Sequence, residues 1–168
     1  MKIENVNDFL EYYSKVRART RRVALLIPDT QLEWTYQPGK FTLGDLVRHI
    51  AAIERWLYAE TVFGRPAAYQ GCGPELASGK AAVLDYFDAM HAESVALFQQ
   101  LTPEQLEAKV STPAGYPITC WKWLRLLPEH EIHHRGQIYL YLNQLGVATP
   151  PLYGLSSEEV LELSQPKS

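Results

Sequence analysis

The sequence EHEIHHRGQIYLYLNQLG, residues 129–146, has the periodicity of an amphipathic helix and contains three of the five histidines of the chain. Successive residues of an α-helix are rotated by about 100° around its axis. At that spacing one face of a helix from Thr119 to Leu145 collects the side chains of Trp123, Leu127, His130, His134, Ile138, Tyr141 and Leu145. The pattern predicts an amphipathic helix that turns two histidines, one helical turn apart, toward a protein core. Glu131, His133 and Arg135 are predicted to lie on its flanks.

Three further segments have the same helical periodicity. They run from a cap at Asn5 or Asn7 to Pro28, from a capping box at Thr42 and Asp45 to about Phe63, and from Ser78 or Gly79 to about Leu101. Residues 102–118 hold three prolines and a glycine, so we expect a connection with at most a short helix after Pro103. Four amphipathic helices of about twenty residues predict an all-α four-helix bundle, and the length predicts a single domain over residues 1–168.

Composition narrows the class of protein. The chain has 46% apolar and 21% charged residues, a formal charge of -3 and a pI near 5.9. This acidic balance disfavours nucleic-acid binding, and no apolar run approaches the roughly 20 residues that span a bilayer. The N-terminus lacks an apolar signal segment, and the two cysteines are not paired in a C-x-x-C motif. We therefore expect a cytoplasmic protein that binds neither nucleic acid nor membrane.

His130-Glu131-Ile132-His133-His134 also fits the H-E-x-x-H pattern of zinc peptidases. In that class the outer histidines bind zinc and the glutamate acts as general base. A peptidase of this type needs a third ligand downstream, for which Glu158, Glu159 or Glu162 are the candidates. The sequence predicts no strand that would align a peptide substrate, which makes the peptidase a remote alternative.

The second predicted helix supplies a third histidine. In LVRHIAAIERW, residues 46–56, His49 lies at the edge of the apolar face, in line with Ile53, Trp56 and Glu60. A facing helix can therefore direct His49 toward His130 and His134, although a histidine at this boundary can equally be bonded to solvent. Three neutral imidazoles with open coordination positions are typical of a catalytic metal site. His91 is expected at the surface.

Pro128 lies just before the first histidine of the fourth helix. A proline inside a helix removes one backbone hydrogen bond and usually bends the helix. Pro128 is therefore expected either to redirect His130 or to mark the true start of the helix.

LVRHIAAIERW and EHEIHHRGQIYLYLNQLG together resemble the DinB-like family, also described as YfiT-like metal-dependent hydrolases, and the resemblance covers nearly the whole chain. It implies a four-helix bundle, often a homodimer, with a divalent metal, commonly nickel or zinc, held by three histidines. Matched residue by residue, these ligands are His49, His130 and His134. Some members of the family are transferases or isomerases that use a low-molecular-weight thiol.

We therefore expect a metal-dependent enzyme that acts on a small molecule, either a thiol S-transferase or a hydrolase. Metal-bound water or thiolate would be its nucleophile. Gln137, Tyr141 and Trp56 are candidates for the substrate pocket, while Arg48 and Arg55 are either carboxylate clamps or part of a solvated face. The alternative is a non-catalytic bundle that binds metal or takes part in a stress response.

Overall fold

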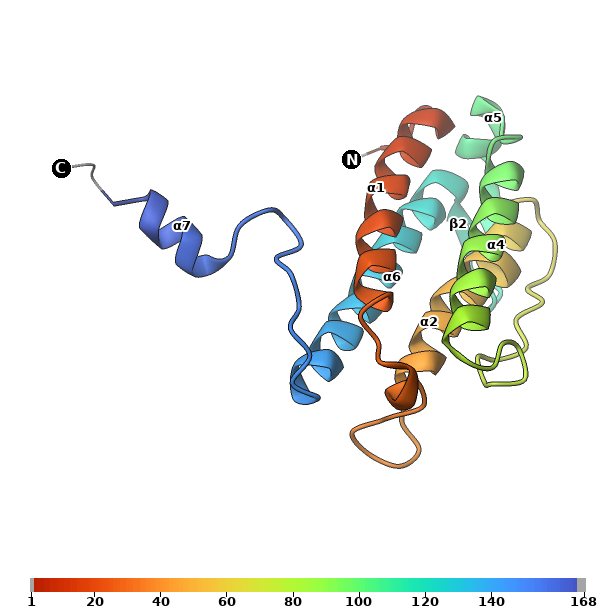
Figure 1. Cartoon of the computed structure of the whole chain (residues 1–168). Coiled ribbons are helices and arrows are strands. Elements are labelled where there is room, and N and C mark those ends of the chain that lie inside the picture. The colour runs from red at the N-terminus through yellow and green to blue at the C-terminus, as the bar shows by residue number, and fades with distance from the viewer. Residues whose placement is uncertain (1, 166–168) are drawn as a thin grey trace.

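Four long helices form a bundle in the computed structural model, which describes residues 2–165 (Figure 1). They are α1 (Val6–Ala24), α2 (Leu43–Ile53), α4 (Lys80–Phe98) and α6 (Cys120–Gln144). A short 3-10 turn, η1 (Asp29–Gln31), lies in the connection between α1 and α2. The predicted all-α four-helix bundle is confirmed.

Side-chain caps define the helix starts. The Asn5 side chain accepts a hydrogen bond from the backbone N–H of Asn7, so Asn5 is the cap of α1. The predicted capping box of Thr42 and Asp45 is present at the start of α2. The expected continuation of α1 to Pro28 is wrong, because the helix ends at Ala24, consistent with the strain that a proline places on the helical residue before it.

The second helix departs from regular α-geometry halfway along its length. After α2, the π-helix η2 (Glu54–Tyr58) and the short α3 (Ala59–Thr61) continue the same rod. A π turn widens the helix and leaves a carbonyl free for a partner outside it. The carbonyl of Trp56 accepts a hydrogen bond of 2.7 Å from the backbone N–H of Ala68, which attaches the following loop to the helix.

The connection between α4 and α6 is more ordered than expected. It contains the short helix α5 (Pro103–Glu107) and an antiparallel hairpin of β1 (Lys109–Ser111) and β2 (Pro117–Thr119). Val110 and Ile118 are paired across the hairpin. The sequence did not indicate this hairpin, because each strand has only three residues and a proline, which lacks the N–H that pairs strands, usually argues against a strand.

Pro128 lies inside α6, and the helix begins earlier, at Cys120. Pro128 therefore does not mark the helix start. Pro128 is buried, while its missing N–H leaves the carbonyl one turn earlier without the usual helical donor.

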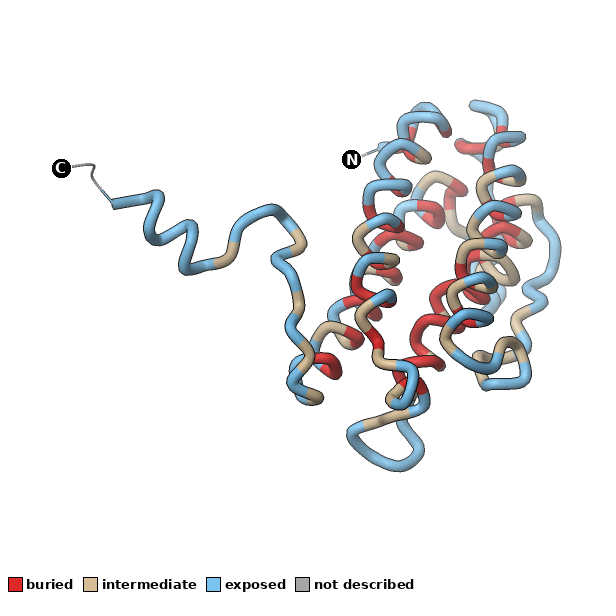
Figure 2. Tube along the Cα trace, viewed as in Figure 1, coloured by how far each residue is buried: buried red, intermediate tan, exposed pale blue. Residues whose placement is uncertain are grey.

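Two apolar clusters make up the interior of the bundle. Figure 2 shows that each of the four long helices contributes buried residues. On α6 the buried members of the first cluster end at Leu127, and those of the second begin at Ile138. The stretch between them holds His130, Glu131 and His134. The fold therefore places the polar side chains of α6 in a belt between two apolar regions.

The last helix, α7 (Ser157–Leu163), stands away from the bundle at the end of an extended segment (Figure 1). Ser156 caps it, and all of its residues are exposed. Across residues 2–165, none of the helices combines the length and the apolar character that crossing a bilayer would require.

Candidate metal centre

The three histidines singled out in the sequence meet between α2 and α6. One ring nitrogen from each of His49, His130 and His134 lies within 4.8 Å of the other two. The Nε2 atoms of His49 and His130 are 3.1 Å apart, and the ring centroids of His130 and His134 are 4.5 Å apart. This arrangement could hold a metal ion.

The outer nitrogens of two of these rings have protein partners. Nδ1 of His134 lies 2.7 Å from the amide oxygen of Gln137, and Nδ1 of His49 lies 2.9 Å from the Tyr69 hydroxyl. Because an amide oxygen only accepts, His134 carries its proton on Nδ1 and keeps the lone pair of Nε2 available. Such outer partners are typical of histidines that bind metal.

The Nε2 atom of His130 is the nitrogen that fits a cation. It faces the Nε2 atom of His49 at 3.1 Å, and each neutral imidazole nitrogen without a proton has a lone pair for a metal ion. The other nitrogen of the ring, Nδ1, is buried and has no hydrogen-bond partner among residues 2–165. The donor set, three imidazoles, suits zinc, nickel, copper and iron alike.

Burial keeps the imidazoles neutral. Desolvation, reinforced by the neighbouring histidines, lowers the pKa of His130 to about 3 and that of His49 to about 4. Burial also lowers the pKa of His134, against the opposing effect of its hydrogen bond with Gln137. At neutral pH all three rings therefore offer lone pairs rather than positive charge.

Aromatic rings border the centre. The ring of Phe41 lies 5.1 Å from that of His49 and 6.3 Å from that of His134. His133 is exposed and lies beside His134, with ring centroids 5.0 Å apart, so it remains outside the group of three.

Glu131 does not lie on an incidental flank, as the sequence suggested. Its side chain is fully buried and faces α1, where Oε2 accepts a 2.8 Å hydrogen bond from the Tyr13 hydroxyl and lies 3.1 Å from Nη2 of Arg17. The glutamate of the H-E-x-x-H pattern therefore binds Tyr13 and Arg17 of α1 and does not act as the general base of a peptidase. The other peptidase candidates, Glu158, Glu159 and Glu162, are exposed on α7, so the described residues do not support the peptidase.

Arg17 lies at the middle of a buried charge network. It pairs with Glu54 as well as Glu131, and Oε1 of Glu54 lies 2.8 Å from Nδ1 of His91. The expectation of a surface His91 is therefore wrong, because the ring is half-buried against Glu54. Two carboxylates can be buried here because α1 supplies a guanidinium between them.

Other arginines are also structural. Arg135 was expected on a flank but is buried, and its Nη1 donates to the Val16 carbonyl at 3.3 Å. Arg48 is fully buried rather than solvated and binds the carboxylates of Glu33 and Asp45. Arg55 pairs with Glu60 and Glu93, so it is not a free clamp for substrate.

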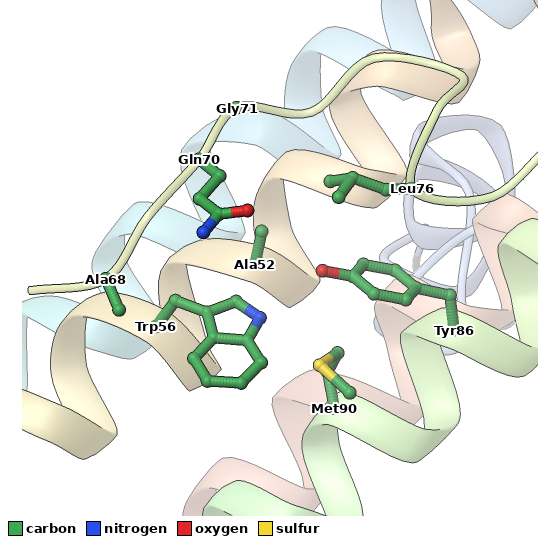
Figure 3. Close-up of a pocket in the computed structure, with 8 residues that line it drawn as sticks. All are labelled: Ala52, Trp56, Ala68, Gln70, Gly71, Leu76, Tyr86 and Met90. Atoms are coloured by element: carbon green, nitrogen blue, oxygen red, sulfur yellow. The ribbon is translucent and has the colours of Figure 1, made fainter.

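The three pocket candidates divide between two cavities. Gln137 and Tyr141 line a cavity of about 410 Å³, together with Tyr36, Lys40, Phe41, Leu46, Leu140 and Gln144. Trp56 lines a different cavity of about 350 Å³, shown in Figure 3. Because Gln137 bonds His134 and Phe41 borders two of the histidines, the first cavity adjoins the candidate metal centre.

The protein is thus a four-helix bundle with a candidate three-histidine metal centre between two of its helices. The chain belongs to the DinB superfamily, whose sequence profile matches residues 12–138.

Known proteins are similar over most of the chain. YjoA of Bacillus subtilis (strain 168) is 27% identical over 153 residues, which cover 88% of this chain and 95% of YjoA. The structure of YfiT from Bacillus subtilis, described as a probable metal-dependent hydrolase with an unusual four-helix bundle topology, aligns with a TM-score of 0.69 at 21% identity. That alignment covers 88% of this chain and 91% of YfiT.

A mycothiol-dependent maleylpyruvate isomerase shares the fold more distantly. Its structure aligns with a TM-score of 0.63 at 14% identity, over 80% of this chain and 60% of the isomerase. At such identities the structural likeness defines the fold alone.

Proposed function

We propose that this protein is a divalent-metal-dependent enzyme in which His49, His130 and His134 hold the metal. The observation that carries the proposal is the convergence of three neutral imidazoles, with one ring nitrogen of each within 4.8 Å of the other two. A bound zinc or nickel ion would supply Lewis acidity, which lowers the pKa of a water or thiol in its open positions. The description of YfiT as a probable metal-dependent hydrolase supports the same assignment.

The cavity beside His134 is the proposed substrate site. Its polar lining includes Gln137, Lys40 and Tyr141, and Phe41 and Leu46 add apolar surface. When the amide oxygen of Gln137 accepts from His134, its NH₂ group is left to donate to a bound small molecule. Gln137 is thereby assigned two tasks, orientation of His134 and contact with substrate.

Thiol transfer is the reaction we favour, with hydrolysis as the related alternative. The support is a shared fold with an isomerase that depends on the thiol mycothiol. In the proposed reaction a low-molecular-weight thiol is the cosubstrate. Its sulfur loses the thiol proton and bonds to a carbon of a small electrophile, from which a leaving group departs, as chloride does from monochlorobimane. We further propose a cytoplasmic homodimer, and the exposed apolar side chains of α7, including Leu161 and Leu163, support association between copies.

The test begins with metal content. Untagged protein reconstituted with zinc or nickel should retain a stoichiometric amount of metal, while His49→Ala and His134→Ala should lose it. His133→Ala is the matched control, because this histidine lies on the same helix but outside the group of three. Loss of metal from the control alone, or equal retention by all variants, would exclude the proposed ligands.

Activity is tested separately on the metal-loaded protein. Conjugation of a low-molecular-weight thiol to monochlorobimane should be accelerated by the wild type and by His133→Ala, but not by His49→Ala. A protein that binds metal at these residues yet accelerates neither conjugation nor hydrolysis would be the non-catalytic bundle.

A further inference from the structure

A second cavity lies between α2, its π extension η2, α4 and the loop before α4 (Figure 3). It has a volume of about 350 Å³ and is lined by Ala52, Trp56, Ala68, Gln70, Gly71, Leu76, Tyr86 and Met90. None of the three histidines lines it, so it is a site separate from the candidate metal centre. This volume lies in the range of small-molecule pockets, which is about 300–1,000 Å³.

The loop that closes this cavity is held in place from the helix side. Ala68 donates its backbone N–H to the Trp56 carbonyl within the π-helix. The buried Arg48 donates to two carbonyls farther along, at 2.7 Å to Cys72 and 3.0 Å to Ala77. The cavity is therefore already formed before any ligand binds, which reduces the entropic cost of binding.

The orientation of the indole is also fixed. The guanidinium of Arg55 lies over the Trp56 ring at 4.2 Å from its centroid, and Arg55 is itself anchored by Glu60 and Glu93. Met90 and Leu76 add apolar surface across from the indole (Figure 3). Such walls suit a flat apolar molecule, because aromatic faces and thioethers pack well against rings.

One polar group in the cavity lacks a partner. The Tyr86 hydroxyl is buried, and its proton has no acceptor in the part of the chain that the structure describes, because the neighbouring Trp56 indole carries only a donor. Figure 3 shows it pointing into the cavity, across from the Gln70 amide. Burial raises the pKa of Tyr86, so the hydroxyl stays protonated at neutral pH and able to donate. A ligand oxygen placed here would satisfy it.

We propose that this cavity binds a small aromatic molecule that carries one hydroxyl or carbonyl oxygen. The ring packs against Trp56, Met90 and Leu76, and the oxygen pairs with the Tyr86 hydroxyl. The proposal does not depend on metal, and it goes beyond the function proposed for the histidine centre.

The experiment compares 2-naphthol with naphthalene, which lacks the oxygen, on metal-free protein of the full chain. Binding is followed by NMR through the indole N–H resonance of Trp56, one of four tryptophans, assigned by its loss in Trp56→Phe. In the wild type we expect saturable shifts for both compounds, with 2-naphthol binding about tenfold more tightly, the range of one hydrogen bond to an otherwise unpaired group. In Tyr86→Phe the two affinities should become equal.

Tyr141→Phe is the matched control, because Tyr141 lines the other cavity and should leave the preference for 2-naphthol unchanged. Equal affinities of the wild type for the two compounds would overturn the role of Tyr86. Absence of a saturable shift at Trp56 up to the solubility limit would overturn the binding site itself. Both results would leave the metal assignment untouched.

Discussion

The Nε2 atoms of His49 and His130 lie 3.1 Å apart, although 81 positions separate the two residues in the chain. Two neutral imidazoles at this distance can share one proton, and the third ring, His134, has its Nε2 lone pair available. This contact connects α2 to α6 at the belt between the two apolar clusters.

The partner of His134 should tune metal affinity. Gln137→Leu removes the acceptor for the Nδ1 proton of His134, so the ring loses its fixed tautomer and orientation. We expect metal affinity to fall by about 10- to 100-fold, measured by competition with a chromogenic chelator. Gln144→Leu, a change in the same cavity away from the histidines, should leave the affinity unchanged. Equal losses in both variants would mean that the cavity, rather than the hydrogen bond, affects the metal.

Acid should destabilise the metal-free protein through its histidines. The folded-state pKa values of His130 and His49, about 3 and about 4, lie below the ordinary value of 6.5. Between these limits the unfolded chain binds more protons than the folded one, so stability falls as the pH decreases from about 6.5 toward 4. Thermal unfolding at several pH values should show a falling Tm over this window.

The matched measurement for this pH dependence is the double variant His49→Gln and His130→Gln. It retains two polar side chains but removes two of the three buried histidines whose pKa values are lowered, leaving His134 in place. Its Tm should depend less steeply on pH between 6.5 and 4 than that of the wild type. Identical slopes would assign the acid sensitivity to other groups.

Glu131 should matter for stability and not for metal. Glu131→Ala leaves Arg17 and the Tyr13 hydroxyl without one buried partner, and breaking a buried pair costs about 3–5 kcal/mol. Urea unfolding should show that loss, while Glu131→Gln, which keeps an acceptor for Tyr13, should lose less. Metal content of both folded variants should equal that of the wild type. A fall in metal content with unchanged stability would contradict this prediction and show that Glu131 contributes to metal binding.

The helix α7 should contribute to dimerisation and not to the stability of the bundle. Leu161 and Leu163 on α7 are 63% and 68% exposed, and α7 stands apart from the bundle. Replacing both with glutamate should convert the proposed homodimer to a monomer in light scattering and leave the Tm of a dilute sample nearly unchanged. A dimer that persists in this variant would place the interface on the bundle.

Periodicity and capping made much of the fold predictable from sequence. Thr42 was recognised as a cap because its hydroxyl and the Asp45 carboxylate satisfy backbone groups only a few residues away. The spacing of His130 and His134 placed both on one side of a helix, for the same local reason. His49 could be paired with them because a bundle has few ways to arrange helices that bury apolar faces.

Long-range partners decided the rest. Glu131 and Arg135 are charged, and charged side chains on a helix flank are usually exposed to solvent. Both are buried here because α1 supplies partners: Arg17 and Tyr13 for Glu131, and the Val16 carbonyl for Arg135. The π turn at Trp56 and the loop attached to it depend on contacts that no local pattern records. The helices and the spacing of the histidines were predictable from local patterns, since both follow from interactions within a few residues. Which charges are buried and where the cavities lie depends on the packing of the helices, because partners distant in the chain offset the cost of desolvation.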